Sequence, residues 1–248
     1  MRVVYVLWLR QMKRYARSKS RVLGAIGQPL LFLLALGYGL GAVFERAGEG
    51  NYLQFLVPGI IAQTILFSAV FWGIQIIWDK QFGFLKETLV APVPRIKIMI
   101  GGALGGATIA AFQGLLVLVI SVALGFRPHN WALVPAAIAL AAVLALALAC
   151  FGSGVASMVN DFQGFQAINQ FLIFPLYFLS GAIYPLAGIP TVLRLISQIN
   201  PLSYAIDALR TLLTGTGHFV FGVDLLALGL TVLVTVVFGL VTFRRIQA

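Results

Sequence analysis

Long runs of apolar residues alternate with short, charged connections along this chain. Six of these runs contain no Asp, Glu, Lys, Arg or His. About 20 apolar residues in a helix cross the hydrocarbon core of a bilayer, which is roughly 30 Å thick. Runs of this length favour helices over the shorter, alternating strands of a membrane barrel. We therefore predict six membrane-spanning helices, at residues 22–44, 55–78, 98–126, 131–159, 167–186 and 225–243.

The composition also indicates a membrane protein. Hydrophobic residues occupy 60% of the 248 positions and charged residues only 10%, too few to cover a soluble domain with polar surface. The six runs use most of the chain. The sequence thus predicts an all-α polytopic membrane protein with a single transmembrane domain at residues 1–248.

Basic residues indicate the orientation of the spans. If the N-terminus is cytoplasmic, 13 Lys and Arg residues fall on the cytoplasmic side and 4 fall outside. We therefore expect both termini in the cytoplasm. The net charge of +10 is explained by this topology and by contact with anionic membrane lipids, so nucleic acid is not an expected partner.

Residues 1–21, before the first span, have the pattern of an amphipathic helix. The basic face comprises Arg10, Lys13, Arg14, Arg17 and Arg21, and the opposite face comprises Tyr5, Trp8, Leu9, Met12, Tyr15 and Ala16. Such a helix lies along a membrane surface, with its basic face toward lipid headgroups or a cytoplasmic partner. It would serve either as a topology anchor alone or as an elbow that moves with the spans.

The connection after the second span predicts a short cytoplasmic helix at 80–91, which ends before two prolines. Apolar residues at helical spacing would form a ridge with charged flanks, and in water this ridge would be exposed. It therefore favours docking into a groove of another protein, although packing against this protein's own helices is an alternative. The residues of the expected contact are Phe82, Phe84, Leu85, Lys86, Glu87 and Leu89.

Polar residues and prolines interrupt the fifth span, and two short helices are predicted after it, at 190–199 and 203–214. Neither is long enough to cross a bilayer. We expect the segment 188–216 to enter the outer leaflet and return, covered by protein or lining a water-filled path.

The residues from Phe174 onward resemble the signature of type-2 ATP-binding-cassette exporter permeases, and most closely those of the daunorubicin-resistance and nodulation-export group. The segments 89–95 and 1–21 are similar to the end of that family's coupling helix and to its elbow helix. The residues that carry the signature are Ser180, Gly181, Pro185, Pro190, Asn200, Pro201, Tyr204, Asp207 and Arg210.

This resemblance implies a permease subunit in a prokaryotic cytoplasmic membrane. Its partners would be a second permease, identical or different, and two separate nucleotide-binding subunits that hold ATP and Mg²⁺. The resemblance implies ATP-driven outward transport by alternating access, with force transmitted through the 80–91 helix.

The chain shows no energy source or catalytic group of its own. The glycine-rich stretch Gly101–Gly106 lacks the lysine of a phosphate-binding loop, and is more simply a close-packing surface between helices. The spans carry no acid or histidine for proton relay or ion coupling. We therefore expect no catalytic residue, no metal site and no cofactor on this chain, and an enzyme is disfavoured.

Neutral polar residues in the spans are candidates to line a path for substrate, although they could equally bond helix to helix. An uncharged path suits a hydrophobic or amphipathic drug or lipid. A lipid-linked saccharide remains an alternative substrate. A passive channel is an alternative of another class, but no charged ring or carbonyl filter is apparent. The candidate path residues are Gln28, Gln63, Thr64, Asn169 and Gln170.

Overall fold

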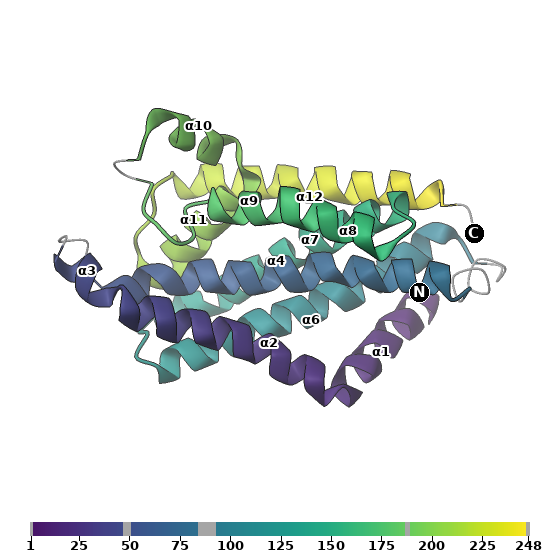
Figure 1. The fold of residues 1–248 in the computed structure, drawn as a ribbon, viewed down its shortest axis with the longest axis horizontal. Helices are drawn as coiled ribbons and strands as arrows, with labels where there is room; N and C mark the ends of the chain where they lie inside the picture. Colours follow the sequence, from purple (N-terminus) through teal and green to yellow (C-terminus); the bar gives the residue numbers. More distant parts are fainter. Residues whose placement is uncertain (1, 47–50, 84–92, 187–188, 247–248) are drawn as a thin grey trace.

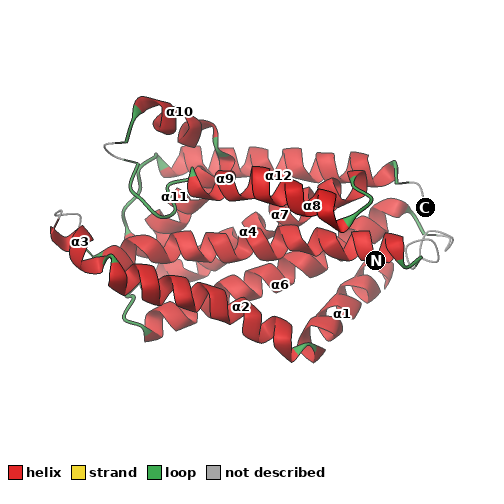
Figure 2. Cartoon of the chain, viewed as in Figure 1, coloured by secondary structure: helices red, strands yellow, loops and turns green. Residues whose placement is uncertain are grey.

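The structure, a computed structural model, describes residues 2–46, 51–83, 93–186 and 189–246. All regular elements in these ranges are helices, as expected from the sequence (Figure 2). In chain order they are α1 (Arg2–Arg17), α2 (Lys19–Phe32), the π-helical η1 (Leu33–Tyr38), α3 (Gly41–Arg46), α4 (Tyr52–Gln81), α6 (Arg95–Ala123), the 3₁₀ turn η2 (Trp131–Leu133), α7 (Val134–Met158), α8 (Phe162–Ile168), the π-helical η3 (Asn169–Ile173), α9 (Phe174–Phe178), α10 (Thr191–Ile199), α11 (Pro201–Thr214) and α12 (Phe221–Arg244).

Four helices of the described chain have the length and apolar composition needed to cross a membrane. They are α4, α6, η2 with α7, and α12, and their bounds lie close to the predicted second, third, fourth and sixth spans. Among them α4 is the most buried and α12 the least. Helix α4 is therefore the centre of the bundle, and α12 lies at its surface.

The other two predicted spans are helical but interrupted. The first, predicted at 22–44, is divided among α2, η1 and α3, and its apolar part is only Leu23–Tyr38. The fifth, predicted at 167–186, begins earlier, at Phe162, and its helix ends at Phe178. The count of six spans and the orientation of the termini therefore stay predictions.

Proline explains the interruption in the fifth segment. Pro175 has no amide hydrogen and its ring would clash with the carbonyl group of Phe171, so the regular α-helical bonding pattern is disturbed before it. The π-helical turn η3 occupies this position. After Phe178 the chain turns sharply, and Gly181 adopts a φ of +74°, a conformation that other residues rarely adopt.

Helices α4 and α7 meet through glycine. A Cβ atom added to Gly73 would lie 2.5 Å from the carbonyl oxygen of Gly152, and one added to Gly152 would lie 2.6 Å from the carbonyl oxygen of Val70. The two backbones are thus in direct contact. Small residues commonly allow this close approach between membrane helices.

The glycine-rich stretch of α6 packs on two sides, which confirms the close-packing interpretation of Gly101–Gly106. A Cβ atom at Gly101 would lie 2.9 Å from Leu7 of α1, whereas Cβ atoms at Gly102 and Gly106 would lie 2.8 and 2.5 Å from the indole of Trp72 of α4. Helix α6 therefore holds α1 on one face and α4 on another.

Helix α1 rests on α6 through its mixed aromatic face. The indole Nε1 of Trp8 donates a hydrogen bond of 3.0 Å to Oγ1 of Thr108, and the phenol of Tyr15 accepts one of 2.9 Å from Nε2 of Gln113. The basic residues Arg10, Lys13, Arg14 and Arg17 are exposed. The amphipathic pattern predicted for residues 1–21 is thus present in α1, although Gln11 is its most buried residue.

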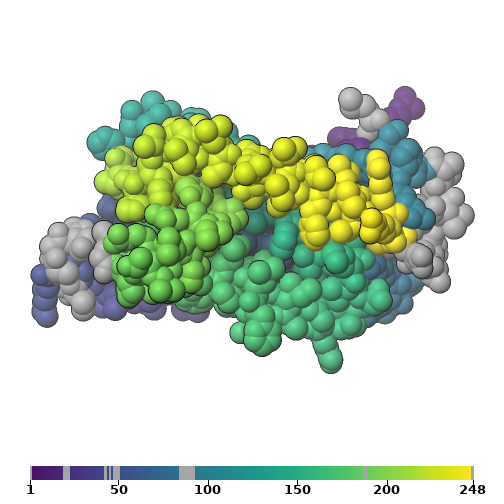
Figure 3. Space-filling view, turned by 90° about the horizontal axis from the view of Figure 1, so that it is seen from above, coloured from purple at the N-terminus to yellow at the C-terminus, as the bar shows by residue number. Residues whose placement is uncertain are grey.

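Different segments of the chain lie at the two ends of the bundle. The two termini lie at the same end in Figure 1, beside the ends of the connection between α4 and α6, whereas α3, α10 and α11 lie at the opposite end. Helix α12 forms a long ridge on one face (Figure 3), with exposed Leu226, Leu230 and Leu233. An apolar ridge of this kind suits contact with lipid.

Candidate functional site

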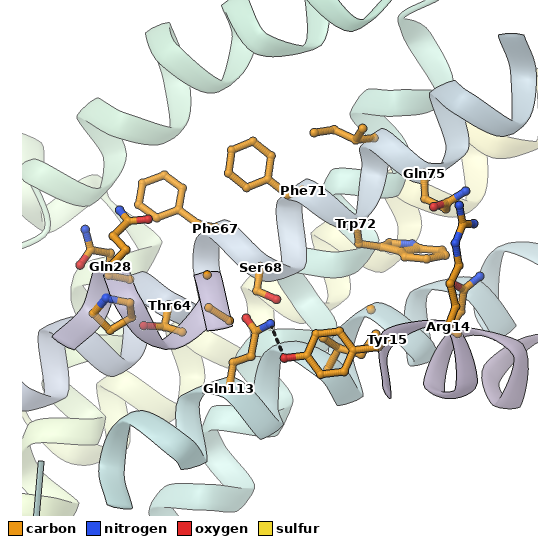
Figure 4. A pocket seen from close by; sticks show the side chains of 18 of the residues that line it. Arg14, Tyr15, Gln28, Thr64, Phe67, Ser68, Phe71, Trp72, Gln75 and Gln113 are labelled. Carbon is orange, nitrogen blue, oxygen red and sulfur yellow. Dashed lines mark hydrogen bonds between the residues drawn. The ribbon is translucent and has the colours of Figure 1, made fainter. Parts of the chain in front are cut away.

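A cavity of about 540 Å³ lies among α1, α2, α4 and α6, with one residue of α8 at its edge (Figure 4). Its walls combine amide and hydroxyl groups with several aromatic rings. The polar side chains are Gln11, Gln28, Gln63, Thr64, Ser68, Gln75 and Gln113, and the aromatic ones are Tyr15, Phe67, Phe71, Trp72, Trp78 and Phe162.

Helix α4 contributes more of the cavity's wall than any other helix. Thr64, Ser68, Phe71 and Gln75 recur at intervals of three or four residues, which places them on the same side of a helix. Thr64 donates its hydroxyl hydrogen to the carbonyl oxygen of Ile60 at 2.8 Å, so this hydrogen is not available to a molecule in the cavity. The resulting surface is suited to an amphipathic molecule rather than to a hydrated ion.

The structure brings three of the five candidate path residues to this cavity and places two elsewhere. Gln28 approaches it from α2, and Gln63 and Thr64 from α4. Asn169 and Gln170 lie on η3, outside the lining. Asn169 is buried and Gln170 is exposed, so these two do not share one environment.

Several lining residues were not predicted from the sequence. Phe67 and Phe71 lie one helical turn apart beside the polar residues of α4, and this pattern was a signal that could have indicated them. Trp72 packs on Gly102 and Gly106, and only the folded structure brings it there. Arg14 also reaches the cavity, although its sequence pattern indicated only a membrane-surface helix.

The predicted coupling helix falls largely outside the described residues. Phe84, Leu85, Lys86, Glu87 and Leu89 all lie within the segment that is not described. The beginning of the predicted range differs from expectation, because α4 continues to Gln81. Phe82, directly after α4, is 71% exposed, and its docking role stays a prediction.

A basic residue anchors each end of this connection. At the end of α4, Nζ of Lys80 donates three hydrogen bonds of 3.0 Å to the carbonyl oxygens of Ala156, Ser157 and Val159. These carbonyl groups lie at the C-terminal end of α7, where the helix dipole is negative and carbonyl groups lack helical donors.

At the start of α6, Arg95 makes the matching contact with α12. Its guanidinium group donates hydrogen bonds of 2.9 Å to the carbonyl oxygens of Arg244 and Ile246. Both ends of the connection between α4 and α6 are therefore tied to the C-terminal ends of other long helices.

At the other end of the bundle, several signature residues form a hydrogen-bonded cluster, which we call the bracket. Its members are Asn200, Tyr204, Asp207 and Arg210. Asn200 caps α11, because its Oδ1 accepts the amide hydrogen of Leu202 at 3.0 Å and its Nδ2 donates to the carbonyl oxygen of Leu176 at 2.6 Å. Pro201 occupies the first turn of α11, where a missing amide hydrogen is tolerated. Tyr204 donates to the carbonyl oxygen of Gln198.

A buried pair of charges completes this bracket. The carboxylate of Asp207 accepts the amide hydrogens of His218 and Phe219, at distances between 2.8 and 2.9 Å. Arg210 lies 4.0 Å from Asp207, donates to the carbonyl oxygen of Gly181 at 3.1 Å, and stacks 4.0 Å above the ring of Phe55. Burial lowers the pKa of Arg210 to about 10, and Asp207 partly offsets this, so the guanidinium stays charged at neutral pH.

The remaining signature residues shape the turns around this pair. Ser180 donates its hydroxyl hydrogen to the carbonyl oxygen of Tyr177, Pro185 lies half-buried in the following loop, and Pro190 precedes α10. The signature residues hold elements together and do not line the cavity.

Comparison with known proteins identifies the family. The family model described as the ABC-2 type transporter matches residues 2–214. The chain belongs to the ABC-2 type transporter family. The resemblance found in the signature residues is thereby confirmed.

Relatives of this ABC-2 permease align over most of their length. It is 29% identical to nodulation protein J of Rhizobium leguminosarum bv. trifolii over 213 residues, which cover 85% of this chain and 78% of the relative. It is 30% identical to the inner membrane transport permease YadH of Escherichia coli strain K12 over 208 residues, which cover 82% and 80%. The chain is therefore a membrane-embedded transport permease.

The anchoring role of Lys80 in this ABC-2 permease can be tested by Lys80→Met, which keeps an unbranched side chain of similar length and removes its charge. The variant is expected to lose about 2 kcal/mol of stability, because the last carbonyl groups of α7 lose a charged donor. Its midpoint of thermal unfolding in detergent should fall. Lys97→Met, an exposed position in α6, is the matched control, and an equal shift in both variants would contradict the anchoring role.

Proposed function

We propose that this permease is the transmembrane subunit of an ATP-driven exporter that moves a hydrophobic or amphipathic compound outward. The observation that carries the proposal is the cavity, whose aromatic rings and neutral amides lie between α4 and the elbow helix α1. Its volume of about 540 Å³ is in the range of pockets that hold drug-sized molecules. A drug or a lipid is the substrate class that fits this lining.

The energy would come from a different polypeptide. Membership of the family implies an ABC ATPase partner in general terms. We propose two such subunits, each holding ATP and Mg²⁺, and a second permease copy that completes the translocation path. The complex would lie in a prokaryotic cytoplasmic membrane with both termini of this chain in the cytoplasm.

The connection between α4 and α6 would receive the mechanical input. Closure of the ATPase subunits would press on the segment 80–91, and Lys80 and Arg95 would pass the displacement to α7 and α12. Rigid-body tilting of these helices would then turn the cavity from an inward-facing to an outward-facing state. The arrangement suits this role because both ends of the segment are tied to long helices.

The coupling role is tested by Leu85→Asp. A carboxylate buried without a partner in the ATPase interface costs several kcal/mol, so ATP-dependent transport by the reconstituted complex should fall more than about tenfold. The amount of permease inserted in the membrane should stay unchanged. Transport would be measured as accumulation of a fluorescent amphipathic dye in vesicles.

Thr216→Asp places the same charge in an exposed loop at the opposite end of the bundle and is the matched control. Normal transport by Leu85→Asp would refute the docking role. A loss that is equal in both variants would refute it as well. Dye flux that is independent of ATP would indicate a passive channel instead.

A further inference from the structure

Charge is distributed unevenly around the cavity. Of the described residues that line it, Arg14 is the only charged one. The acidic group closest in sequence to the lining of α4, Asp79, is already engaged. It accepts a hydrogen bond of 2.8 Å from Gln75 and lies 3.9 Å from Arg10. In the described part of the chain no hydrogen bond or ion pair occupies the guanidinium group of Arg14, which is therefore available to an anion.

The cavity carries its charged group at one end, and aromatic rings line its wall along α4. In Figure 4, Arg14 and Gln75 lie together at one end, and the rings of Phe71 and Phe67 follow along α4 toward Gln28. Arg14 is exposed, so this end opens at the protein surface. A molecule with an anionic head and an extended apolar chain would match both parts at once.

The position of α1 indicates that such a molecule would come from the membrane. This helix exposes Arg10, Lys13 and Arg17 next to Arg14, and a basic amphipathic helix lies at the level of lipid headgroups. Each basic residue near an anionic membrane surface attracts its lipids. The open end of the cavity is therefore presented to the headgroups of the leaflet in which α1 lies.

We propose that this cavity binds an anionic phospholipid. Its phosphate lies against Arg14, and one acyl chain enters the cavity along Phe67 and Phe71. The rest of the lipid remains in the bilayer. This site is a property of the permease alone and requires neither the ATPase subunits nor transport, so its failure would leave the exporter proposal intact.

Tryptophan fluorescence offers a direct test, because Trp72 lines the cavity. The protein has four tryptophans. A variant that carries Trp8→Phe, Trp78→Phe and Trp131→Phe retains only Trp72. It would be placed in nanodiscs of phosphatidylcholine with increasing fractions of brominated phosphatidylglycerol or brominated phosphatidylcholine. We expect half-maximal quenching of Trp72 at about a fivefold lower lipid fraction with brominated phosphatidylglycerol than with brominated phosphatidylcholine. This factor corresponds to the attraction that one cation contributes near an anionic surface.

Arg14→Gln should abolish this preference, whereas Arg17→Gln should retain it, because Arg17 is exposed on the same helix but does not line the cavity. A protein that retains only Trp131, outside the cavity, should show no preference. Equal quenching of Trp72 by the two lipids would overturn the proposal, as would a preference that survives Arg14→Gln.

Native mass spectrometry provides a second measurement in which all four tryptophans are kept. The permease purified from vesicles of phosphatidylglycerol and phosphatidylcholine should retain phosphatidylglycerol, and Arg14→Gln should retain several-fold less of it than Arg17→Gln. Equal retention by the two variants would contradict the site. Only defined lipids are present in these vesicles, so the mass of the retained molecule identifies it as phosphatidylglycerol or phosphatidylcholine.

Discussion

Asp207→Ala is expected to lower the free energy of unfolding by about 3–5 kcal/mol, the range found when one member of a buried ion pair is removed. The guanidinium group of Arg210 would stay buried without its carboxylate, and the amide hydrogens of His218 and Phe219 would lose their acceptor. The loop that joins α11 to α12 would loosen. A large drop in the midpoint of thermal unfolding in detergent would show this loss.

Two further variants test the cause of this loss of stability. Asp207→Asn keeps an acceptor oxygen and should lose less stability than Asp207→Ala. Asp161→Ala is the matched control, since Asp161 caps α8 by accepting the amide hydrogen of Gly164 at an exposed site. Loss of such a cap is worth about 1 kcal/mol. If Asp207→Ala is no more harmful than Asp161→Ala, the buried pair does not hold the bracket.

Gly73→Val is expected to destabilise the bundle by about 3 kcal/mol or more, because the added side chain would meet the backbone of Gly152 on α7. Neither helix can yield by rotating a side chain, so α4 and α7 must separate. The measurement is the yield of folded, monodisperse protein together with its midpoint of thermal unfolding. Reduced yield at unchanged membrane insertion is the expected pattern.

Gly229→Val, in α12, is the matched control for this substitution. No atom lies within 4 Å of a Cβ atom added at Gly229, so the valine side chain has space there. This variant should behave like the unchanged protein. A Gly73→Val protein with the same stability as Gly229→Val would show that the contact between α4 and α7 is not close.

The long helices could be predicted because their physical cause is local. A mostly apolar run of 19 or more uncharged residues has few alternatives to a membrane-crossing helix, and α4, α6, α7 and α12 follow such runs closely. The two short helices α10 and α11 were also predicted, on either side of Asn200. The second was expected from residue 203 but begins at Pro201, since proline is tolerated in the first turn of a helix. The pattern gave no sign of the interruption at η1, whereas polar residues and prolines had indicated an irregular fifth segment, where η3 lies.

The site was only partly predictable because its walls come from four helices. Gln63 and Thr64 could be named because they are neutral polar residues within an apolar span, and both line the cavity. The approach of Arg14 and Trp72 to the same space depends on how α1 and α4 pack on the glycines of α6, which no local pattern encodes. Lys80 and Arg95 were counted as topology signals, and only the structure shows their contacts with α7 and α12.

The two ends of the bundle carry different groups of contacts. Near the termini, Lys80 and Arg95 connect the segment 80–91 to the long helices, and Arg14 opens the cavity to anionic lipid. At the opposite end, Asp207 and Arg210 fix the short helices against α4. Movement would therefore begin at the first end and reach the second end through the long helices.

Dependence on a separate ATPase is tested by active transport in sealed vesicles that contain the purified permease, with and without an ABC ATPase partner. We expect a fluorescent amphipathic dye to accumulate against its gradient only when both the ATPase and ATP are present. Accumulation against the gradient by the permease alone, without nucleotide, would contradict this dependence.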